Sequence, residues 1–436
     1  MKNYNNKNYN RLTSDSTSSS ASSNMYIKDW RTALRSPPSY RIGNRTIRFQ
    51  IHFLWILASL LTLVLIFFYI KPTSNYKYYE NSGVVGGWMN NPQQQQQQHI
   101  TSPKTLENLQ NNYFYNYTYP LSSPIISNGI RSFRIGLIAD LDTNSKTSEK
   151  DNLWKSYLKK GYLSFNPTKR AIVVSWDNKD PTEMSSSFSL KGRGMELSEL
   201  VVFNGRLLTF DDRTGFIYEI LNDHVIPWII LIDGNGQTDK GFKSEWATVK
   251  DRILYVGSMG KEWTTSSGEF ENINPMYVKA VNVHGEVQHI NWEANYKKLR
   301  SAIDIQWPGY MIHESGVWSD DNKRWYFLPR RCSKDRYNET KDEFMGCNVL
   351  LSADENFTNV DVLEIKSKTT QRQATHGYAS FKFLPGTKDE VIIALSTEEL
   401  NGKTSSFISA FTIKGEILFE EEKIPTNYKY EGFEFI

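Results

Sequence analysis

The feature that most constrains the fold is a five-fold repeat of a short strand-forming motif. The copies are MELSELVVFNG at 195–205, KSEWATVKD at 243–251, IHESGVWSD at 312–320, GYASFKFLPG at 377–386 and YEGFEFI at 430–436. Alignment of the copies makes five residues equivalent, with separations of 47, 69, 66 and 51 residues: Ser198, Glu245, Glu314, Ser380 and Glu431. Such separations suit four-stranded propeller blades that are joined by loops of variable length.

The sequence around the repeats is typical of an all-β domain. From about Gly129 to Ile436, short apolar or alternating runs rich in Val, Ile, Tyr, Phe and Trp are separated by turn signals such as Asn-Gly and Pro-Gly. Helical periodicity is present only around 152–160 and 292–302. Because the last copy leaves room for one strand, the FRIGLIAD strand at 133–140 is expected to complete its sheet. We therefore predict an all-β domain that folds as a five-bladed β-propeller.

The transmembrane helix is predicted at residues 51–70. The run IHFLWILASLLTLVLIFFYI has no formal charge and, at 1.5 Å per residue, spans a hydrocarbon core of about 30 Å. Basic residues precede it, at 31, 35, 41, 45 and 48, whereas only Lys71 and Lys77 follow closely. The positive-inside rule then keeps the N-terminus cytosolic. The length of the leading region and the lack of an A-x-A-like site favour an uncleaved signal anchor over a signal peptide.

Composition divides the rest of the chain. Residues 1–50 are predicted to be a disordered cytosolic tail, 71–120 a flexible luminal stem and 121–436 the propeller domain. We expect a type II membrane protein of the endoplasmic reticulum or Golgi, which stem proteolysis could release outside the cell. Of the 51 Lys and Arg, nine fall in residues 1–50, and the remainder of the chain is slightly acidic. No nucleic-acid partner is therefore expected, and association into a homodimer stays open.

Two covalent features follow from a luminal location. The two Cys, Cys332 and Cys347, are expected to form a disulfide that contributes roughly 3 kcal/mol. Three sequons are expected to carry glycans: Asn116, Asn338 and Asn356. A fourth sequon, at Asn44, lies on the cytosolic side and is expected to stay bare.

The five equivalent residues suggest a metal site. Inner strands of a propeller run along the central channel, so these three Glu and two Ser could point at one axial position. Three carboxylates in a narrow channel require a cation, and an all-oxygen ring favours Ca²⁺ over Zn²⁺. The same Glu could equally be solvated residues at blade edges, and spacing alone does not separate the two interpretations.

Longer motifs resemble the calcium-activated nucleotidases of the soluble apyrase family. They include RIGLIADLD at 134–142, KGRGMELSELVVFNGRLLTFDDRTGFIYEI at 191–220, LYVGSMGKEWTT and RWYFLPRR, and the resemblance covers residues 113–436 in order. It implies a five-bladed propeller with a central Ca²⁺ and hydrolysis of nucleoside diphosphates and triphosphates, usually UDP and GDP. The family's calcium ring falls on the five residues that the repeat had selected.

The resemblance also implies catalytic residues. Asp140 and Asp142 could simply end a strand, and Asp212 and Arg213 look like a hairpin turn, but the family places Asp140 and Asp212 among its required carboxylates. We therefore assign Asp140, Asp142 and Asp212 to the catalytic site and Arg213 to substrate binding. Arg193 and Arg330 are candidates for phosphate contact, since guanidinium binds phosphoryl oxygens bidentately; either could instead form a surface salt bridge. Trp263 could stack on the base, although a propeller Trp is more often core, and Asp177 is a weaker carboxylate candidate.

The expected mechanism is direct, Ca²⁺-assisted hydrolysis of a phosphoanhydride, with Asp140 or Asp212 orienting water and Arg stabilising the transition state. Two other functions compete with it. A luminal glycosyltransferase could use Asp140 and Asp142 as a metal site, and a non-catalytic propeller could use Ca²⁺ only as a plug. The five-fold repeat runs against the first; absence of activity would favour the second.

Overall fold

The computed structural model describes residues 115–436 apart from 149, 367–372 and 427, together with 40–42, 45–47, 59, 61 and 62. The chain divides into two units, Met1–His99 and Ile100–Ile436. In the first unit, β1 (Tyr40–Ile42) pairs with β2 (Arg45–Ile47), and residues 59, 61 and 62 are helical. The predicted tail, anchor and most of the stem otherwise lie outside the described residues. Among the residues that are described, no helix has the length and apolar character needed to cross a bilayer.

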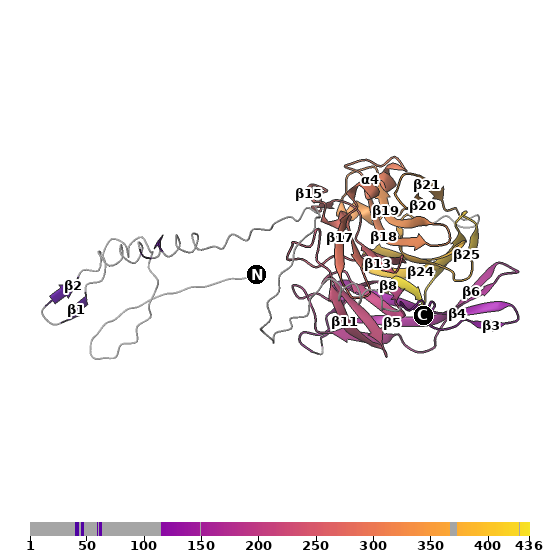
Figure 1. The fold of residues 1–436 in the computed structure, drawn as a ribbon, viewed down its shortest axis with the longest axis horizontal. Helices are drawn as coiled ribbons and strands as arrows, with labels where there is room; N and C mark the ends of the chain where they lie inside the picture. Colours follow the sequence, from indigo (N-terminus) through magenta and orange to yellow (C-terminus); the bar gives the residue numbers. More distant parts are fainter. Residues whose placement is uncertain are drawn as a thin grey trace, which may run out of the picture. The chain divides into compact units, whose positions relative to one another are not determined.

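The second unit is built from five antiparallel sheets, as predicted (Figure 1). Blade 2 contains β8 (Leu197–Phe203), β9 (Arg206–Asp211), β10 (Phe216–Leu221) and β11 (His224–Ile230). Blade 3 contains β12 (Trp246–Lys250), β13 (Ile253–Gly257), β16 (Tyr277–Val281) and β17 (Val287–Asn291). Blade 4 contains β18 (Tyr310–Ser319), β19 (Arg324–Ser333), β20 (Val349–Asp354) and β21 (Val360–Glu364). Blade 5 contains β22 (His376–Phe383), β23 (Val391–Leu400), β24 (Lys403–Thr412) and β25 (Ile417–Lys423).

Blade 1 closes the ring by joining the two ends of the domain. Its strands are β26 (Lys429–Phe435), β4 (Ile130–Asp140), β5 (Trp154–Asn166) and β6 (Ala171–Trp176), with β3 (Ile125–Ser127) on β4 and β7 (Thr182–Ser186) on β5. The pairing of β26 with β4 confirms that the FRIGLIAD strand completes the last repeat. The β3–β4 and β5–β6 hairpins project from the domain in Figure 1.

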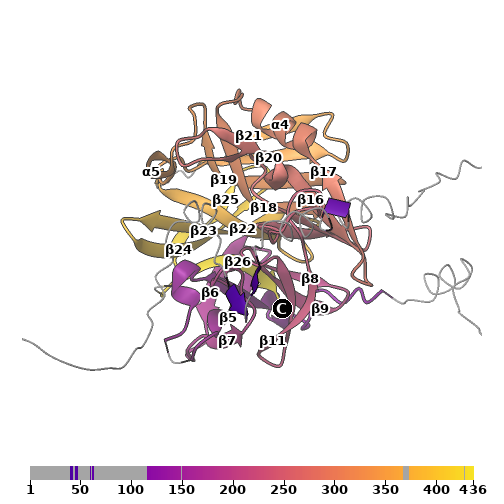
Figure 2. The ribbon, with the colours of Figure 1, turned by 90° about the vertical axis from the view of Figure 1, so that its left-hand side faces the viewer.

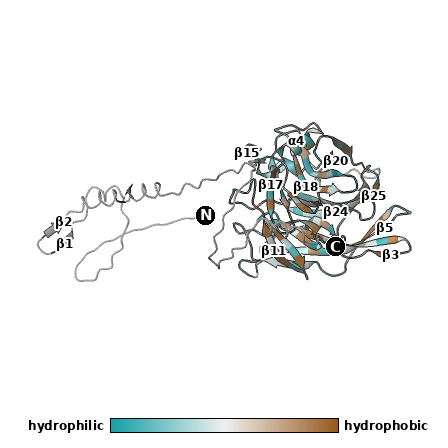
Figure 3. Ribbon diagram, in the orientation of Figure 1, coloured by the Kyte–Doolittle hydropathy of each residue, from teal (hydrophilic) through white to brown (hydrophobic). Residues whose placement is uncertain are grey.

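The inner strands β8, β12, β18, β22 and β26 contact one another in this order around the ring. Figure 2 shows β8, β18, β22 and β26 toward the middle of the domain and β11 and β21 at its outer edges. Each neighbouring pair of blades shares a buried hydrophobic cluster. In Figure 3, hydrophobic segments, coloured brown, lie along the strands of the domain. Burial of apolar area between blades, at about 25 cal/mol per Å², therefore stabilises the ring.

A few short helices and one hairpin lie outside the blades. The short elements are η1 (Asp142–Ser145), η2 (Asn274–Met276), α5 (Glu339–Asp342) and the hairpin of β14 (Trp263–Thr264) with β15 (Phe270–Asn272). Helix α4 (Glu293–Ser301) confirms the helical periodicity near 292–302. The helix expected around 152–160 is wrong, because this segment begins β5. Its Trp154, Ser156 and Leu158 are buried with a period of two, and the added apolar Tyr157 imitates helical spacing.

The segment 115–119 precedes the predicted start of the domain yet contacts it. Tyr115 packs edge-on against Phe203 with ring centroids 5.8 Å apart, and the Asn116 amide donates to Asn204 Oδ1 at 2.8 Å. The hydroxyl of Tyr119 donates to Glu434 at 3.0 Å. The ordered domain thus includes the last residues of the segment assigned to the stem.

Candidate active site at the mouth of the central channel

The repeated position coincides with a break in strand register. Pairing shifts in β8 between Leu197 and Glu199 and in β26 between Tyr430 and Gly432, so Ser198 and Glu431 are the extra residues of two β-bulges. In β18 the shift encloses Glu314. A bulge bends the strand and turns a side chain away from the sheet face. This local geometry aims the repeat residues into the channel.

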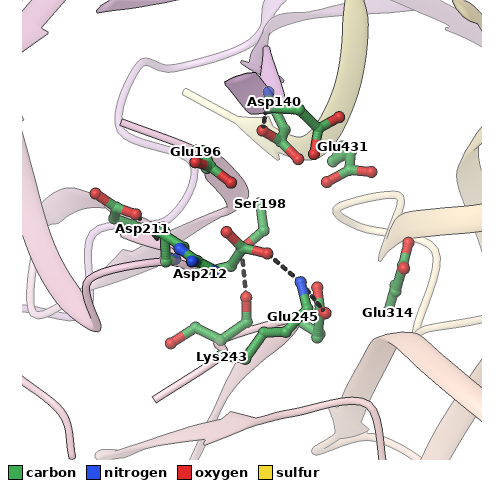
Figure 4. Close-up of polar contacts among 12 residues, drawn as sticks. Asp140, Glu196, Ser198, Asp211, Asp212, Lys243, Glu245, Glu314 and Glu431 are labelled. Carbon is green, nitrogen blue, oxygen red and sulfur yellow. Dashed lines mark hydrogen bonds and ion pairs between the residues drawn. The ribbon is translucent and has the colours of Figure 1, made fainter. Parts of the chain in front are cut away.

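Acidic side chains from four blades gather there (Figure 4). Asp140 ends β4, Asp212 follows β9, Glu245 precedes β12, and Glu314 and Glu431 lie within β18 and β26. Figure 4 shows the carboxylates of Asp140, Glu431, Glu314, Glu245 and Asp212 around one space, with Ser198 beside them. Except for the half-buried Glu314, these side chains are buried. The three predicted ring glutamates therefore converge with Asp140 and Asp212, two of the three predicted catalytic aspartates.

Three cationic side chains lie between these carboxylates. Lys243 contacts Asp212 and, at 2.8 Å, Glu245. Arg330 donates to Glu314 and, at 2.9 Å, to Glu431. Lys429 is the strand partner of Asp140, and its Nζ lies 2.8 Å from Asp140, 2.7 Å from Asp142, 2.8 Å from Glu399 and 3.4 Å from Glu431. The mouth is thus a network in which cations alternate with anions.

The cations do not neutralise the network. Burial raises the pKa of Glu245 to about 8; Lys243 opposes this shift, while Glu314 and Asp212 add repulsion. Burial likewise raises the pKa of Asp212 to about 6 against the charge of Lys243, and it raises that of Glu431 well above its usual range. For Asp140, burial acts to raise the pKa, but the charge and hydrogen bond of Lys429, the Asp142 amide and the charge of Lys243 together outweigh it, so its pKa is lowered. Excess negative charge therefore stays in the mouth, which favours a further cation.

The donor atoms fit a hard divalent cation. One carboxylate oxygen of Asp212, Oδ1, is buried and has no hydrogen-bond partner among the described residues. The carboxylates of Asp140, Asp142 and Glu196 also offer oxygens that all lie within 4.8 Å of one another. Oxygen donors of this kind suit Ca²⁺, which takes six to eight of them. The residues present are thus compatible with the predicted calcium site.

The two serines of the predicted ring differ from the glutamates. Ser198 donates its hydroxyl to the carbonyl of Ser244. Ser380 lies one residue after the register shift of β22, and its hydroxyl donates to both carboxylate oxygens of Glu199, at 2.9 and 3.1 Å. Ser198 therefore lies beside the acidic mouth. The Ser380 hydroxyl instead binds Glu199, further along the channel.

The two adjacent aspartates of the DDRTG turn have different partners. Asp211 accepts backbone N–H groups from Met195, at 2.8 Å, and from Arg213, at 3.0 Å, so it holds the turn together. Asp212 instead contacts Lys243 in the mouth. The Arg213 Nε is buried without a hydrogen-bond partner among the described residues. Arg193 donates to Glu196 at 2.7 Å and lies 3.7 Å from Asp142, which brings this predicted phosphate ligand to the same mouth.

Two other candidates lie elsewhere. Asp177 forms two hydrogen bonds with Arg134, at 2.7 and 2.6 Å, and Arg134 is six residues from Asp140, roughly 20 Å along β4. This carboxylate is therefore paired with Arg134 and lies away from the mouth. Trp263 lies on β14, where Lys240 Nζ is 4.1 Å from its ring centroid and Met259, Tyr310 and Ile312 form the adjoining cluster.

The structure describes the two cysteines and the three predicted glycosylation sites. Cys332 and Cys347 are joined in a disulfide with Cα atoms 5.3 Å apart. Asn116 and Asn356 are exposed. Asn338 caps α5 by accepting the Lys341 N–H at 3.1 Å.

Several residues of the mouth were not predicted: Glu196, Lys243, Glu399 and Lys429. Three of them stand within or beside repeat copies, since Glu196 is in MELSEL, Lys243 opens KSEWATVKD and Lys429 directly precedes YEGFEFI. Aligning the residues just before each repeat position would have found these three. Glu399 ends β23 outside the repeat motif, and only the fold brings it to Lys429.

The family model and the similar proteins point to one family. The family model described as Apyrase matches residues 141–436. The rat (Rattus norvegicus) protein named "Soluble calcium-activated nucleotidase 1" is 52% identical over 322 residues, which cover 74% of this chain and 78% of the relative. The protein named "Apyrase" from Cimex lectularius is 46% identical over 321 residues, which cover 74% of this chain and 87% of the relative. "Apyrase apy-1" of Caenorhabditis elegans is 42% identical over 308 residues, covering 70% and 85%.

Proposed function

Because this chain belongs to the apyrase family, we propose that it is a calcium-dependent enzyme that hydrolyses the phosphoanhydride bonds of nucleoside diphosphates and triphosphates, with UDP and GDP preferred. The observation that carries the proposal is the mouth of the channel, where Asp140, Asp212, Glu245, Glu314 and Glu431 outnumber the cations between them. Such a site can hold both a metal ion and a phosphate chain.

The ion would be held by the ring glutamates. Glu245, Glu314 and Glu431 come from three different blades and face one space, with Ser198 and Ser380 as the remaining members of the predicted ring. Bound there, Ca²⁺ would neutralise and orient phosphoryl oxygens. Burial, with repulsion from Glu314 and Asp212, raises the pKa of Glu245 to about 8, and the charge of a bound cation would act against this shift.

The cations of the mouth supply phosphate contacts. Arg330 and Lys429 are fixed by carboxylates on two or more sides, so their donors are oriented before substrate arrives. Arg193 lies at the rim beside Asp142. Preoriented donors stabilise charge that builds on phosphoryl oxygens without reorganising during the reaction.

Asp212 and Asp140 are the candidates for orienting the attacking water. The free Oδ1 of Asp212 is buried and available to accept a proton or hydrogen bond. Asp140 has its Oδ1 occupied by the Asp142 amide at 2.8 Å and its Oδ2 by Lys429. Asp212 is therefore the better general base, and Asp140 the better anchor for Lys429 and the phosphate chain. Trp263 and Arg213 are proposed to contribute to substrate binding outside this reacting centre.

The test is phosphate release by the full-length chain with UDP, GDP, ADP and ATP, each with Ca²⁺, Mg²⁺ or chelator. We expect Ca²⁺-dependent release that Asp212→Asn lowers by 10²- to 10⁴-fold, the range for general-base catalysis. Asp223→Asn is the matched control, because Asp223 is exposed and pairs with Lys160 on the surface. Full activity of Asp212→Asn, or equal release with chelator, would contradict the proposal.

The competing functions have different outcomes. A β-propeller of the apyrase family runs against the glycosyltransferase alternative. A Ca²⁺-plugged binding module would release no phosphate under any cation but would still gain thermal stability from Ca²⁺. That result would support the proposed metal site and contradict the proposed enzymatic activity.

The cellular setting is part of the proposal. We place the catalytic domain on the luminal side of the endoplasmic reticulum or Golgi, anchored by residues 51–70 and open to release by stem cleavage. There it would remove nucleoside diphosphates left by glycosyl transfer. Glycosidase treatment should increase the gel mobility of the wild-type chain, and Asn356→Gln should reduce that shift; a chain with no glycan would oppose the luminal topology.

A further inference from the structure

A second cavity lies between blade 1 and the segment that leads from blade 5 into β26. Its volume is about 760 Å³, within the range of small-molecule pockets. One side is lined by Tyr157, Lys159 and Trp176 of blade 1, and the other by Pro425, Thr426 and Tyr428. Strands β6 and β25 contact each other beside it and lie on the same side of the domain in Figure 1. We call this cavity the interblade groove.

The groove arises from a gap in the pairing of β5. Residues 161–166 of β5 pair with β6, whereas 154–158 pair with β7. The loop at 177–181 leaves the sheet between these two pairings, and the Asp177 N–H donates to the Lys160 carbonyl at 3.1 Å. Lys159 therefore stands where the outer edge of the blade opens.

Lys159 is a recessed cation. The residue is 8% exposed, and its Nζ makes no ion pair or hydrogen bond with the described part of the chain. The nearest carboxylate in the loop, Asp177, is bound by Arg134 through two hydrogen bonds. Burial lowers the pKa of Lys159, opposed by the charges of Asp177 and Asp180. An ammonium at the wall of a groove that has no partner in the described part of the chain is available to bind an anion.

One aromatic ring lies beside this cation, and two more line the same groove. The Trp176 ring centroid is 5.5 Å from Lys159 Nζ. Tyr157 and Tyr428 stack with centroids 4.4 Å apart and an interplanar angle of 15°, so blade 1 and the segment before β26 form one aromatic wall. Flat aromatic walls bind the faces of nucleobases and of sugar rings, while an ammonium binds phosphate or carboxylate.

We propose that the interblade groove is a binding site for a small anion that carries a flat or sugar ring, with Lys159 as the anion ligand and Tyr157, Trp176 and Tyr428 as the ring contacts. The site is separate from the channel mouth, since none of these four side chains forms a contact with the carboxylates described there. It does not depend on the proposed hydrolysis. A nucleoside monophosphate and a uronic acid share the required chemistry.

The test is isothermal titration of the full-length chain with uridine 5′-monophosphate, glucuronate and inorganic phosphate. We expect at least one ring-bearing anion to bind more tightly than phosphate, and Lys159→Gln to weaken that binding at least tenfold. Lys160→Gln is the matched control. It removes the same charge one residue away on the opposite face of β5, where Lys160 pairs with Asp223 at 2.7 Å. Its binding should equal that of wild type.

The outcomes distinguish the two kinds of ligand, and they distinguish binding in the groove from binding in the channel. Tighter binding of uridine 5′-monophosphate indicates a nucleotide site, and tighter binding of glucuronate an acidic-sugar site. Equal affinity in Lys159→Gln and Lys160→Gln would assign the binding to the channel and overturn the proposal, as would no binding of any probe. If Lys159→Gln fails to fold, Lys159→Arg should retain binding and Trp176→Leu should weaken it. Nucleotide hydrolysis by Lys159→Gln should stay within twofold of wild type, which distinguishes this result from failure of the proposed function.

Discussion

The mouth of the central channel and the region further along the inner strands both hold buried charge, but they satisfy it differently. In the second region, which we call the far network, Glu199 accepts hydrogen bonds from Ser380 and the Leu200 amide and pairs with Lys382 at 3.0 Å. Glu434 accepts from the Val202 and Phe435 amides and from Tyr119. Each far carboxylate is therefore held by several protein donors.

The carboxylates of the mouth are held by fewer protein donors. Asp212 Oδ1 lacks a partner among the described residues, and each cation there is shared by two or more carboxylates. Buried polar networks stabilise a fold when fully satisfied, and an unsatisfied network costs free energy. The difference agrees with our proposal that metal and substrate bind at the mouth, whereas the far network serves the fold.

The largest expected effect on stability is at the far network. Lys382→Met leaves Glu199 buried without its cation, which should lower the free energy of unfolding by about 3–5 kcal/mol. Urea denaturation of the full-length chain measures it, with and without Ca²⁺, and the loss should be the same in both. Lys160→Met is the control, because its pair with Asp223 is exposed and contributes at most about 1 kcal/mol. If Ca²⁺ restored the free energy of unfolding of Lys382→Met, Lys382 would belong to the metal site. The proposed difference between the far network and the mouth would then be wrong.

The next effect is metal binding at the mouth. Ca²⁺ at 100 times its Kd should raise the free energy of unfolding of wild type by about 2.7 kcal/mol. Glu245→Gln should abolish most of this gain, because it removes a charged ring oxygen, whereas Glu219→Gln, on the surface pair with Arg206, should retain it. Thermal melts over a Ca²⁺ series give both values. An unchanged Ca²⁺ shift in Glu245→Gln would remove this residue from the metal site.

The smallest effect concerns Tyr119. Tyr119→Phe removes one donor to Glu434 while two backbone amides still bind that carboxylate, so the free energy of unfolding should fall by about 1 kcal/mol. Phosphate release should not change. Tyr117→Phe is the control on an exposed ring. Reduced activity in Tyr119→Phe would show that the two ends of the channel are coupled.

Local sequence patterns were sufficient for the architecture. Repeats at 195–205, 243–251, 312–320, 377–386 and 430–436 became the inner edges of five blades, because burial on the inner strand demands the same pattern each time. The single failure, at 152–160, occurred where Tyr157 faces the interblade groove and adds an apolar residue outside the alternation. The resemblance to the apyrase family, not periodicity, selected Asp140 and Asp212.

The sequence by itself thus determined the five blades, the closure of the ring by its two ends and the acidic residues at the repeat position, since each depends on neighbours along the chain. Only the tertiary structure decided which charges meet. Arg330 and Glu431 are 101 residues apart and Ser380 and Glu199 are 181 apart, so no local pattern encodes their pairing. The physical reason is that electrostatic energy in a buried channel depends on the distances between the charged groups and on the hydration that they lose. Both are set only when the blades pack into a ring.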